Sequence, residues 1–194
     1  MNNGLLVVIS GPSGVGKGTV LKEVFEKDDR LAYSVSLTTR APREGEHNGV
    51  EYNFVTKDEF LKNVENGRML EYTEYCGNYY GTSAEYVERQ RADGKDVILE
   101  IETEGGGNVK RLFPDSVLIF IAPPSVEELE RRLTERGTEN PEAVARRIKR
   151  AKEELASSGI YDYIVTNDTV ERAAEEIAAI LRAERIKNNI LRGE

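Results

Sequence analysis

Short apolar runs alternate along the chain with stretches whose apolar residues recur at helical spacing. The runs are rich in β-branched residues and predict strands at 5–10, 31–37, 97–102, 117–122 and 161–167. The helical stretches follow the first run and recur at 57–66, 84–93, 126–158 (as two helices) and 169–187. Strands that alternate with helices predict an α/β fold with a parallel sheet covered on both faces.

Two segments interrupt this alternation. Residues 38–50 are polar and rich in turn formers, and aromatic and polar residues then alternate from 51 to 83, which predicts a small β-rich lobe. Residues 126–150 form a charged helical insertion. We therefore expect residues 1–194 to form a single domain. Its core takes in about 1–33, 84–125 and 151–194, with the lobe at about 34–83 and the insertion at about 126–150.

Composition narrows the function classes. The chain is 39% hydrophobic and 32% charged, which is typical of a folded globular protein. Its net charge of −8 argues against bulk nucleic-acid binding. Its one cysteine cannot form an internal disulfide, and we see neither a signal peptide nor an apolar run long enough to span a bilayer. We expect a cytoplasmic protein without nucleic-acid or membrane partners, as a monomer or a homo-oligomer.

A glycine-rich loop follows the first predicted strand. The stretch GPSGVGKGT (11–19) fits the phosphate-binding pattern G-x-x-x-x-G-K-[ST] up to its last letter, and a predicted helix follows it. Backbone N–H groups and the helix N-terminus can cradle a phosphate there, and Lys17 can reach the β- and γ-phosphates. A tight turn with a solvated lysine is the alternative, and the strand–loop–helix context favours the phosphate site. The expected nucleotide ligands are Gly11, Pro12, Ser13, Gly14, Val15, Gly16, Lys17, Gly18 and Thr19.

Gly18 stands where the pattern has a hydroxyl residue. Without that hydroxyl, Mg²⁺ would be held by phosphates, water and an acid elsewhere. Thr19 can still offer its hydroxyl to a phosphate oxygen. The GKGT sequence therefore favours a small-molecule kinase over a switch GTPase.

A second anion site is expected in the basic loop TTRAPR. Arg40 and Arg43 lie three residues apart, and a planar guanidinium binds phosphate oxygens in pairs. Tyr52, Tyr79 and Tyr80 can donate O–H groups to the same phosphate. A solvated basic turn beside core tyrosines is the alternative reading.

Polar residues at predicted strand ends or loop edges could select a base. Guanine presents N1–H and N2–H₂ donors beside its O6 acceptor, so carboxylates and hydroxyls together would favour it over adenine. The candidates are Ser36, Glu71, Thr82 and Glu102. Taken singly, each could equally be a surface polar residue.

These residues lie in longer strings that resemble the guanylate kinase family over nearly the whole chain. The strings are GPSGVGKGT (11–19), SVSLTTRAPREGEHNGVEYNFV (34–55), LEYTEYCGNYYGTS (70–83), FIAPPS (120–125), RLTERGTE (132–139) and TND (166–168). The resemblance implies transfer of the γ-phosphoryl group of ATP to GMP with Mg²⁺, and leaves dGMP open as a second acceptor. It implies a three-layer P-loop kinase core with a parallel sheet, a nucleotide-acceptor lobe and a helical lid.

The resemblance also implies roles for individual residues. Ser36, Glu71, Thr82 and Glu102 match guanine contacts, and Arg40, Arg43, Tyr52 and Tyr80 match ligands of the acceptor phosphate. Arg132, Arg136 and Arg147 match lid arginines that, with Lys17 and Arg40, act on the transferring group, and Asn167 matches a position near the donor adenine. Arg131, Arg146 and Arg150 are instead expected on a solvated helix face, paired with Glu127, Glu128, Glu130 and Glu135.

The stretch LEIETEGGG (99–107) departs from the family's usual L-[DE]-I-D-x-Q-G-A. Glu100 is an allowed acid, suited to anchoring Mg²⁺ through water. Glu102 is one methylene longer than the usual Asp, and Glu104 replaces the usual Gln. Gly106 and Gly107 replace larger residues and should weaken a helix by roughly 1 kcal/mol each.

Two other functions would suit parts of this pattern. Ribose 1,5-bisphosphate phosphokinases resemble the family but lose the guanine contacts. Guanylate-kinase-like scaffold domains bind phosphorylated peptides without catalysis, usually with a degraded P-loop. The intact loop and the presence of Ser36, Glu71 and Thr82 favour the kinase.

Overall fold

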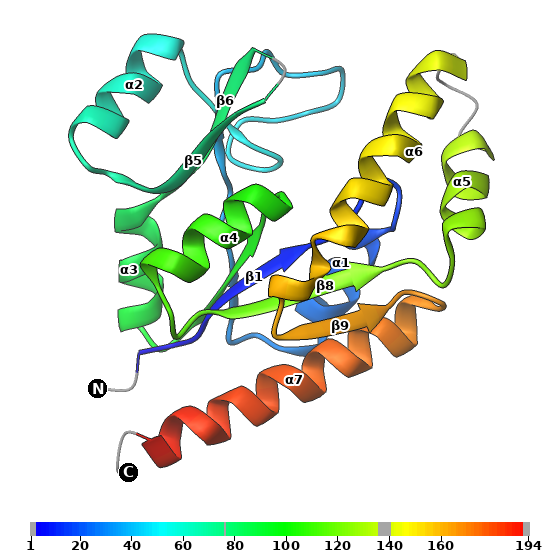
Figure 1. The fold of residues 1–194 in the computed structure, drawn as a ribbon. Helices are drawn as coiled ribbons and strands as arrows, with labels where there is room; N and C mark the ends of the chain where they lie inside the picture. The colour runs from blue at the N-terminus through cyan, green and yellow to red at the C-terminus, as the bar shows by residue number, and fades with distance from the viewer. Residues whose placement is uncertain (1–2, 76, 136–140, 192–194) are drawn as a thin grey trace.

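The computed structural model describes residues 3–75, 77–135 and 141–191, and a parallel sheet lies at its centre (Figure 1). The strand order is β2-β7-β1-β8-β9, and every neighbouring pair is parallel. The strands are β1 (Leu6–Ser10), β2 (Leu31–Tyr33), β7 (Asp96–Glu100), β8 (Val117–Ala122) and β9 (Tyr163–Thr166). The predicted parallel sheet is thereby confirmed.

Helices cover both faces of this sheet. On one face, α1 (Lys17–Lys27) and α7 (Val170–Leu191) pack Leu21 and Ile177 against the buried side chains of β1 and β8. On the other face, α3 (Ala84–Ala92) and α4 (Thr103–Leu112) contribute Val87 and Val109 to a second cluster. Helix–sheet–helix layering results, as predicted, and α7 crosses beneath the sheet in Figure 1.

A second, mixed sheet forms the β-rich lobe. Its order is β4-β3-β6-β5, in which β3 pairs parallel with β4 and antiparallel with β6. The elements are β3 (Leu37–Thr38), β4 (Asn53–Phe54), α2 (Lys57–Glu65), β5 (Met69–Tyr75) and β6 (Asn78–Ser83). Buried Phe60 of α2 lies against the rings of Tyr72 and Tyr79, which fastens the helix to this sheet.

The single strand predicted at 31–37 is wrong, because the chain changes sheets in the middle of it. The Ser34 N–H donates to the Ile98 carbonyl (3.0 Å) beside the central sheet, whereas the Ser36 carbonyl accepts from the Asn53 N–H (2.8 Å) in the lobe. The apolar run therefore supplies β2 to one sheet and β3 to the other. The strand predicted at 97–102 also ends early, at Glu100.

The glycines of α4 lie in a regular helix, with Glu102 at its N-cap. A Cβ on Gly106 would lie 2.8 Å from the Tyr161 hydroxyl oxygen, closer than real Cβ atoms approach a neighbour. Helix propensity disfavours glycine at this position, but packing favours it at Gly106, since a Cβ there would require Tyr161 or the helix to shift.

The charged insertion forms two helices, as predicted: α5 (Val126–Glu135) and α6 (Pro141–Ala156), followed by the short η1 (Ser158–Ile160). Leu129 and Leu133 pack against Ala151 to join the two helices. Arg136, an expected lid arginine, lies outside the described residues. Among the helices that the structure describes, none has the length and apolar character needed to cross a bilayer.

Candidate functional site

The glycine loop lies between β1 and α1 as the pattern predicts. Gly16 precedes α1 with φ +94°, a left-handed conformation that favours glycine. The Lys17 ammonium donates to the Gly11 carbonyl at 2.7 Å, so it lies back along the loop. Burial lowers the pKa of Lys17, while the nearby carboxylates of Glu100, Glu154 and Glu102 act in the opposite direction. The loop therefore presents a partly desolvated cation close to a group of acids.

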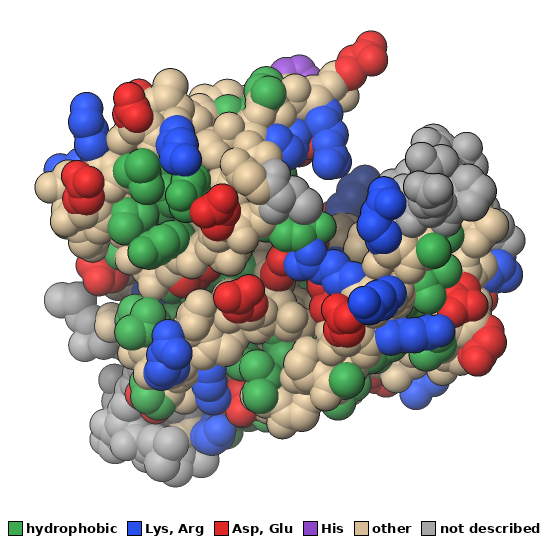
Figure 2. All heavy atoms as spheres, turned by 45° about the horizontal axis from the view of Figure 1, so that its top comes forward, with side chains coloured by type: hydrophobic (Ala, Val, Ile, Leu, Met, Phe, Trp, Pro, Cys, Tyr) green, Lys and Arg blue, Asp and Glu red, His purple; other side chains and the backbone are tan. Residues whose placement is uncertain are grey.

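A cleft of about 580 Å³ joins this loop to the β-rich lobe. Figure 2 shows the molecule hollowed between the lobe and the α5–α6 side, with basic and acidic side chains along the hollow. The cleft brings together twelve of the expected site residues: Gly11, Ser13, Lys17, Ser36, Arg40, Arg43, Tyr52, Glu71, Tyr80, Glu100, Glu102 and Arg147.

Glu71 is the most enclosed acid in this cleft. Its side chain comes from β5, the residue is 6% exposed, and Oε1 accepts a 2.7 Å hydrogen bond from the hydroxyl of buried Thr82 on β6. Burial raises the pKa of Glu71, and the Thr82 hydroxyl opposes that shift by donating to the ionised form. The pair thus presents a fixed acceptor to the cleft.

In the basic loop, the two arginines are held by Glu46, a residue that the sequence analysis did not identify. Glu46 accepts from Arg40 Nη2 at 2.9 Å and from the Arg43 backbone N–H at 2.7 Å, which fixes both residues in one turn. The Arg40 guanidinium also lies 5.4 Å from the centre of the Tyr52 ring. The only available signal was the spacing of Glu46 after Arg43 in PREGE.

The tyrosine pair divides between the two faces of the lobe sheet. Tyr80 lines the cleft, and its ring lies 5.9 Å from that of Tyr52. Tyr79, expected as a phosphate donor, instead stacks on Phe60 at 5.5 Å on the α2 side. That expectation was wrong because successive residues of a strand point to opposite faces.

Glu100 lies where β7 ends, beside the glycine loop. Its Oε2 accepts from the Tyr33 hydroxyl at 3.2 Å, a contact that sequence reading missed. Within residues 3–75, 77–135 and 141–191, no three His, Cys, Asp or Glu side chains cluster in a way that could hold a metal. A Mg²⁺ ion here would take most of its ligands from phosphates and water, which fits a single supporting carboxylate.

A second cavity of about 400 Å³ lies on the far side of the loop, lined by Gly14, Gly16, Thr19, Arg132, Asn167, Asp168 and Val170. Buried Asn167 donates through Nδ2 to the Val15 carbonyl at 2.7 Å, and Arg132 Nη2 donates to the Asn167 carbonyl at 3.2 Å. Arg132 thus lies beside this cavity and not among the residues that line the main cleft.

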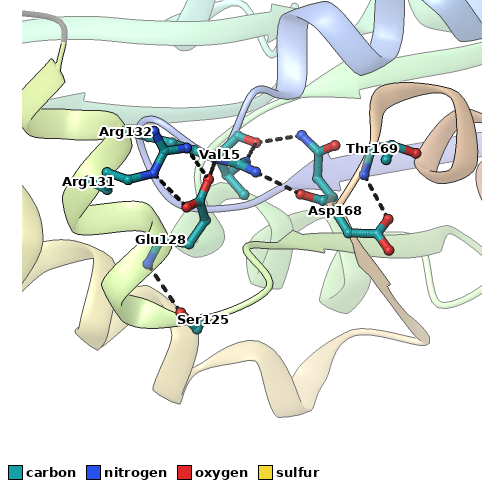
Figure 3. A network of polar contacts seen from close by, with 8 residues as sticks. Val15, Ser125, Glu128, Arg131, Arg132, Asp168 and Thr169 are labelled. Carbon is teal, nitrogen blue, oxygen red and sulfur yellow. Dashed lines mark hydrogen bonds and ion pairs between the residues drawn. The ribbon is translucent and has the colours of Figure 1, made fainter.

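Glu128 holds Arg132 in place from the same helix, as Figure 3 shows. Its carboxylate accepts from Arg131 and Arg132, and these hydrogen bonds lower the pKa of Glu128 to about 2. Arg131, expected to pair with a helix glutamate, does so.

The α6 arginines differ from one another in their contacts. Arg147 Nη2 donates to the Ser13 hydroxyl at 2.6 Å, so α6 reaches the glycine loop. Arg150 was expected on a solvated face and is instead a cleft residue, 2.5 Å from Glu102. The expectation failed because the spacing within α6 does not show which other element faces it.

Comparisons with known proteins agree with this geometry. The guanylate kinase family model matches residues 3–184. The chain is 52% identical to a guanylate kinase of Bacillus subtilis (strain 168), over 95% of this chain and 91% of that protein. It is 54% identical to one of Streptococcus agalactiae serotype III (strain NEM316), over 93% and 87%. A crystal structure of guanylate kinase from Anaplasma phagocytophilum superposes with a TM-score of 0.78 at 36% identity, covering 94% of this chain and 87% of that one. The chain belongs to the guanylate kinase family.

Proposed function

We propose that the 580 Å³ cleft is where this ATP:GMP phosphotransferase brings its two substrates together. One observation carries the proposal: Lys17 of the glycine loop and Glu71 of the lobe line the same cavity. The first suits the phosphates of a donor nucleotide, and the second suits the N–H donors of a base. A direct transfer requires both within one enclosure.

The donor, ATP, would lie along the glycine loop. Backbone N–H groups of residues 11–19 and the start of α1 receive its phosphates, and Lys17 turns from the Gly11 carbonyl towards the β- and γ-phosphates. Asn167 and Arg132 border the cavity that suits its adenosine part. Mg²⁺, when bound, neutralises phosphate charge, and Glu100 is the acid that would hold it.

The acceptor, GMP, would lie against the lobe. Ser36, Thr82, Glu71 and Glu102 meet the edge of guanine, and Arg40, Arg43, Tyr52 and Tyr80 hold the phosphate. A guanidinium that leaves Glu46 for this phosphate exchanges one charged partner for another, so the exchange costs little. The acceptor phosphate is already a nucleophile, and so the protein needs to supply only alignment and charge neutralisation.

Closure of the lid would complete the site. We propose the division into a core (about 1–33, 84–125 and 151–194), an acceptor lobe (34–83) and a lid (126–150) that carries Arg132, Arg136 and Arg147 over the transferring group. The contact between Arg147 and Ser13 supports this role, since it already joins α6 to the loop. Closure also has to exclude water, or ATP would be hydrolysed.

Neither rival function is favoured, because relatives matched over most of the chain are guanylate kinases. We further propose a cytoplasmic location, on the basis of the single cysteine, with dGMP as a second acceptor and without nucleic-acid partners. The monomer and the homo-oligomer are alternatives that sedimentation would decide.

Paired variants test the division of roles. Lys17→Met should abolish turnover while the dissociation constant of GMP stays within a few-fold of the starting value. Glu71→Gln should raise the KM for GMP at least about tenfold and leave the KM for ATP unchanged, because one charged acceptor is lost. Lys22→Met on α1 and Glu74→Gln on β5, both exposed, are matched controls. Turnover by Lys17→Met, or an unchanged GMP KM in Glu71→Gln, would overturn the assignment.

A further inference from the structure

Arg150 joins three elements around the cleft. Its Nη2 lies 2.5 Å from Glu102 Oε2 at the N-cap of α4, and its Nε donates to Glu154 Oε1 at 3.1 Å within α6. Its guanidinium carbon lies 4.2 Å from the centre of the Tyr75 ring at the end of β5. A planar cation held by two carboxylates and an aromatic face has a well-defined orientation.

Glu102 depends on this partner for its own orientation. It stands at the N-cap of α4, but its side chain makes no capping hydrogen bond, and 43% of the side chain is exposed. Burial raises the pKa of Glu102, and the charge of Arg150 opposes that shift and so favours the ionised form. Arg150 therefore orients a carboxylate that would otherwise sample several rotamers, and its positive charge favours the ionised form of that carboxylate.

The contact leaves acceptor capacity for a ligand. Among the described residues, the polar contact that the structure gives Glu102 is through Oε2, so Oε1 can accept a further hydrogen bond. Glu71 already receives the Thr82 hydroxyl on one oxygen. Guanine carries an N1–H and both hydrogens of its 2-amino group, and Glu71 alone cannot accept hydrogen bonds of good geometry from all of these donors. A second oriented carboxylate is what the 2-amino group requires.

We propose that Arg150 is a positioning residue for acceptor selection, which holds the Glu102 carboxylate so that Oε1 receives the 2-amino group of guanine. The inference rests on the proposed role of Glu102 in binding guanine. Arg150 acts through Glu102 and does not touch the reacting atoms. The longer reach of Glu102, compared with the Asp usual in the family, is matched in this chain by a cation placed to hold it.

The test compares GMP with IMP, whose base lacks the 2-amino group. In Arg150→Met, kcat/KM for GMP should fall about tenfold, mainly through KM, while kcat/KM for IMP and the KM for ATP stay unchanged. Arg150→Lys should restore part of the preference for GMP. Lys149→Met is the matched control, since Lys149 has the same charge, is the preceding residue of α6, and has an 81% exposed side chain. If Arg150→Met does not fold, Arg150→Gln carries the same comparison.

The Glu102→Gln variant distinguishes a failure of the inference about Arg150 from a failure of the proposed role of Glu102 in binding guanine. If Glu102→Gln leaves the GMP-to-IMP ratio of kcat/KM unchanged, the role of Glu102 itself is wrong. If Glu102→Gln lowers the ratio but Arg150→Met does not, or Arg150→Met tightens GMP binding, the inference about Arg150 is overturned. In the Glu102→Gln background, Arg150→Met should cause no further loss of the ratio.

Discussion

At the scale of single residues, each of three acids in the site is oriented by a neighbouring side chain. Thr82 holds Glu71, Tyr33 holds Glu100, and Arg150 holds Glu102. A carboxylate that is fixed before the substrate arrives loses less side-chain entropy on binding. The guanine selection that we propose for this cleft therefore depends on the partners as much as on the acids.

The Thr82–Glu71 pair makes the acid side of the pH profile predictable. Thr82→Val removes the hydroxyl that lowers the pKa of Glu71, while burial, which raises it, remains. The pKa should therefore rise further, and Glu71 should lose its charge at a higher pH than in the starting protein. The acid limb of kcat/KM for GMP is expected to move to higher pH, as measured by initial rates at a series of pH values.

A control variant measured in the same pH series checks this prediction. Thr134→Val, an exposed change on α5, should leave the acid limb in place. An acid limb that stays fixed in Thr82→Val, or moves to lower pH, would contradict a controlling role for the Thr82 hydroxyl.

The sequence alone predicted which residues lie in the site better than it predicted which side chains contact one another there. Lys17, Arg40 and Glu71 lie in the strings that carry the resemblance, and the structure places all of them in the cleft. The pairing of one side chain with another was missed, because these contacts form only in the folded chain. Tyr33 and Glu100 lie 67 residues apart, and Glu102 and Arg150 lie 48 residues apart.

At the scale of elements, the first turns of α4 decide how closely the helix approaches the sheet. Gly105 and Gly106 are buried, and Glu71 Oε2 would lie 3.2 Å from a Cβ on Gly105. The helix start therefore packs directly against Glu71, the acid that we propose selects guanine. Residues that disfavour a helix in isolation serve here to bring it close to the site.

Alanine substitutions at two neighbouring glycines of α4 should change the free energy of unfolding in opposite directions. Gly106→Ala places a Cβ 2.8 Å from the Tyr161 hydroxyl, and buried Tyr161 packs against Phe120, so a loss of about 1–3 kcal/mol in the free energy of unfolding is expected. At Gly107 the nearest atom, on Ile160, would lie 3.5 Å away, an ordinary contact. Gly107→Ala should therefore gain up to about 1 kcal/mol from helix propensity. Urea denaturation measures both.

Tyr161→Phe identifies the cause of the loss. Without the hydroxyl, the Cβ of Gly106→Ala no longer meets an oxygen, and the double variant should recover most of the stability. Equal stability of Gly106→Ala and Gly107→Ala would show that packing against Tyr161 does not determine the choice of residue.

Periodicity predicted the type of most elements but not the sheet to which each belongs. Residues 31–37 read as one apolar run, yet β2 and β3 lie in different sheets. The change of direction between Ser34 and Ser36 depends on hydrogen bonds to Ile98 and Asn53, which are distant in sequence. No local pattern carries that information.

At the scale of the whole molecule, an ion-pair network fastens the last helix to the core. Arg185 of α7 contacts Asp96 at 2.5 Å and Asp28 at 2.8 Å, and Asp96 also accepts from the Leu5 N–H at 2.8 Å. Asp96 is 4% exposed, so its charge needs a partner. Asp28, Asp96 and Arg185 are not among the residues that line the cleft. A change in this network should therefore alter the stability of the protein and leave its catalysis unchanged.

Arg185→Met should consequently lower stability without changing catalysis. Loss of one partner of a buried pair costs about 3 kcal/mol, which thermal or urea unfolding would detect. The KM values for ATP and GMP should stay unchanged, and Arg182→Met, exposed on the same helix, should have little effect. A change in KM with unchanged stability would contradict this separation.

A panel of acceptors shows whether one cleft joins a P-loop donor site to an acceptor site that selects guanine. Mg-ATP is supplied with GMP, AMP or CMP, and ADP and nucleoside diphosphate are measured together. We predict ADP and GDP in equal amounts, with kcat/KM for GMP at least about a hundredfold above the other acceptors. Turnover of AMP or CMP at the rate of GMP, or ADP formed without GDP, would show that the cleft does not select guanine or does not join the two substrates.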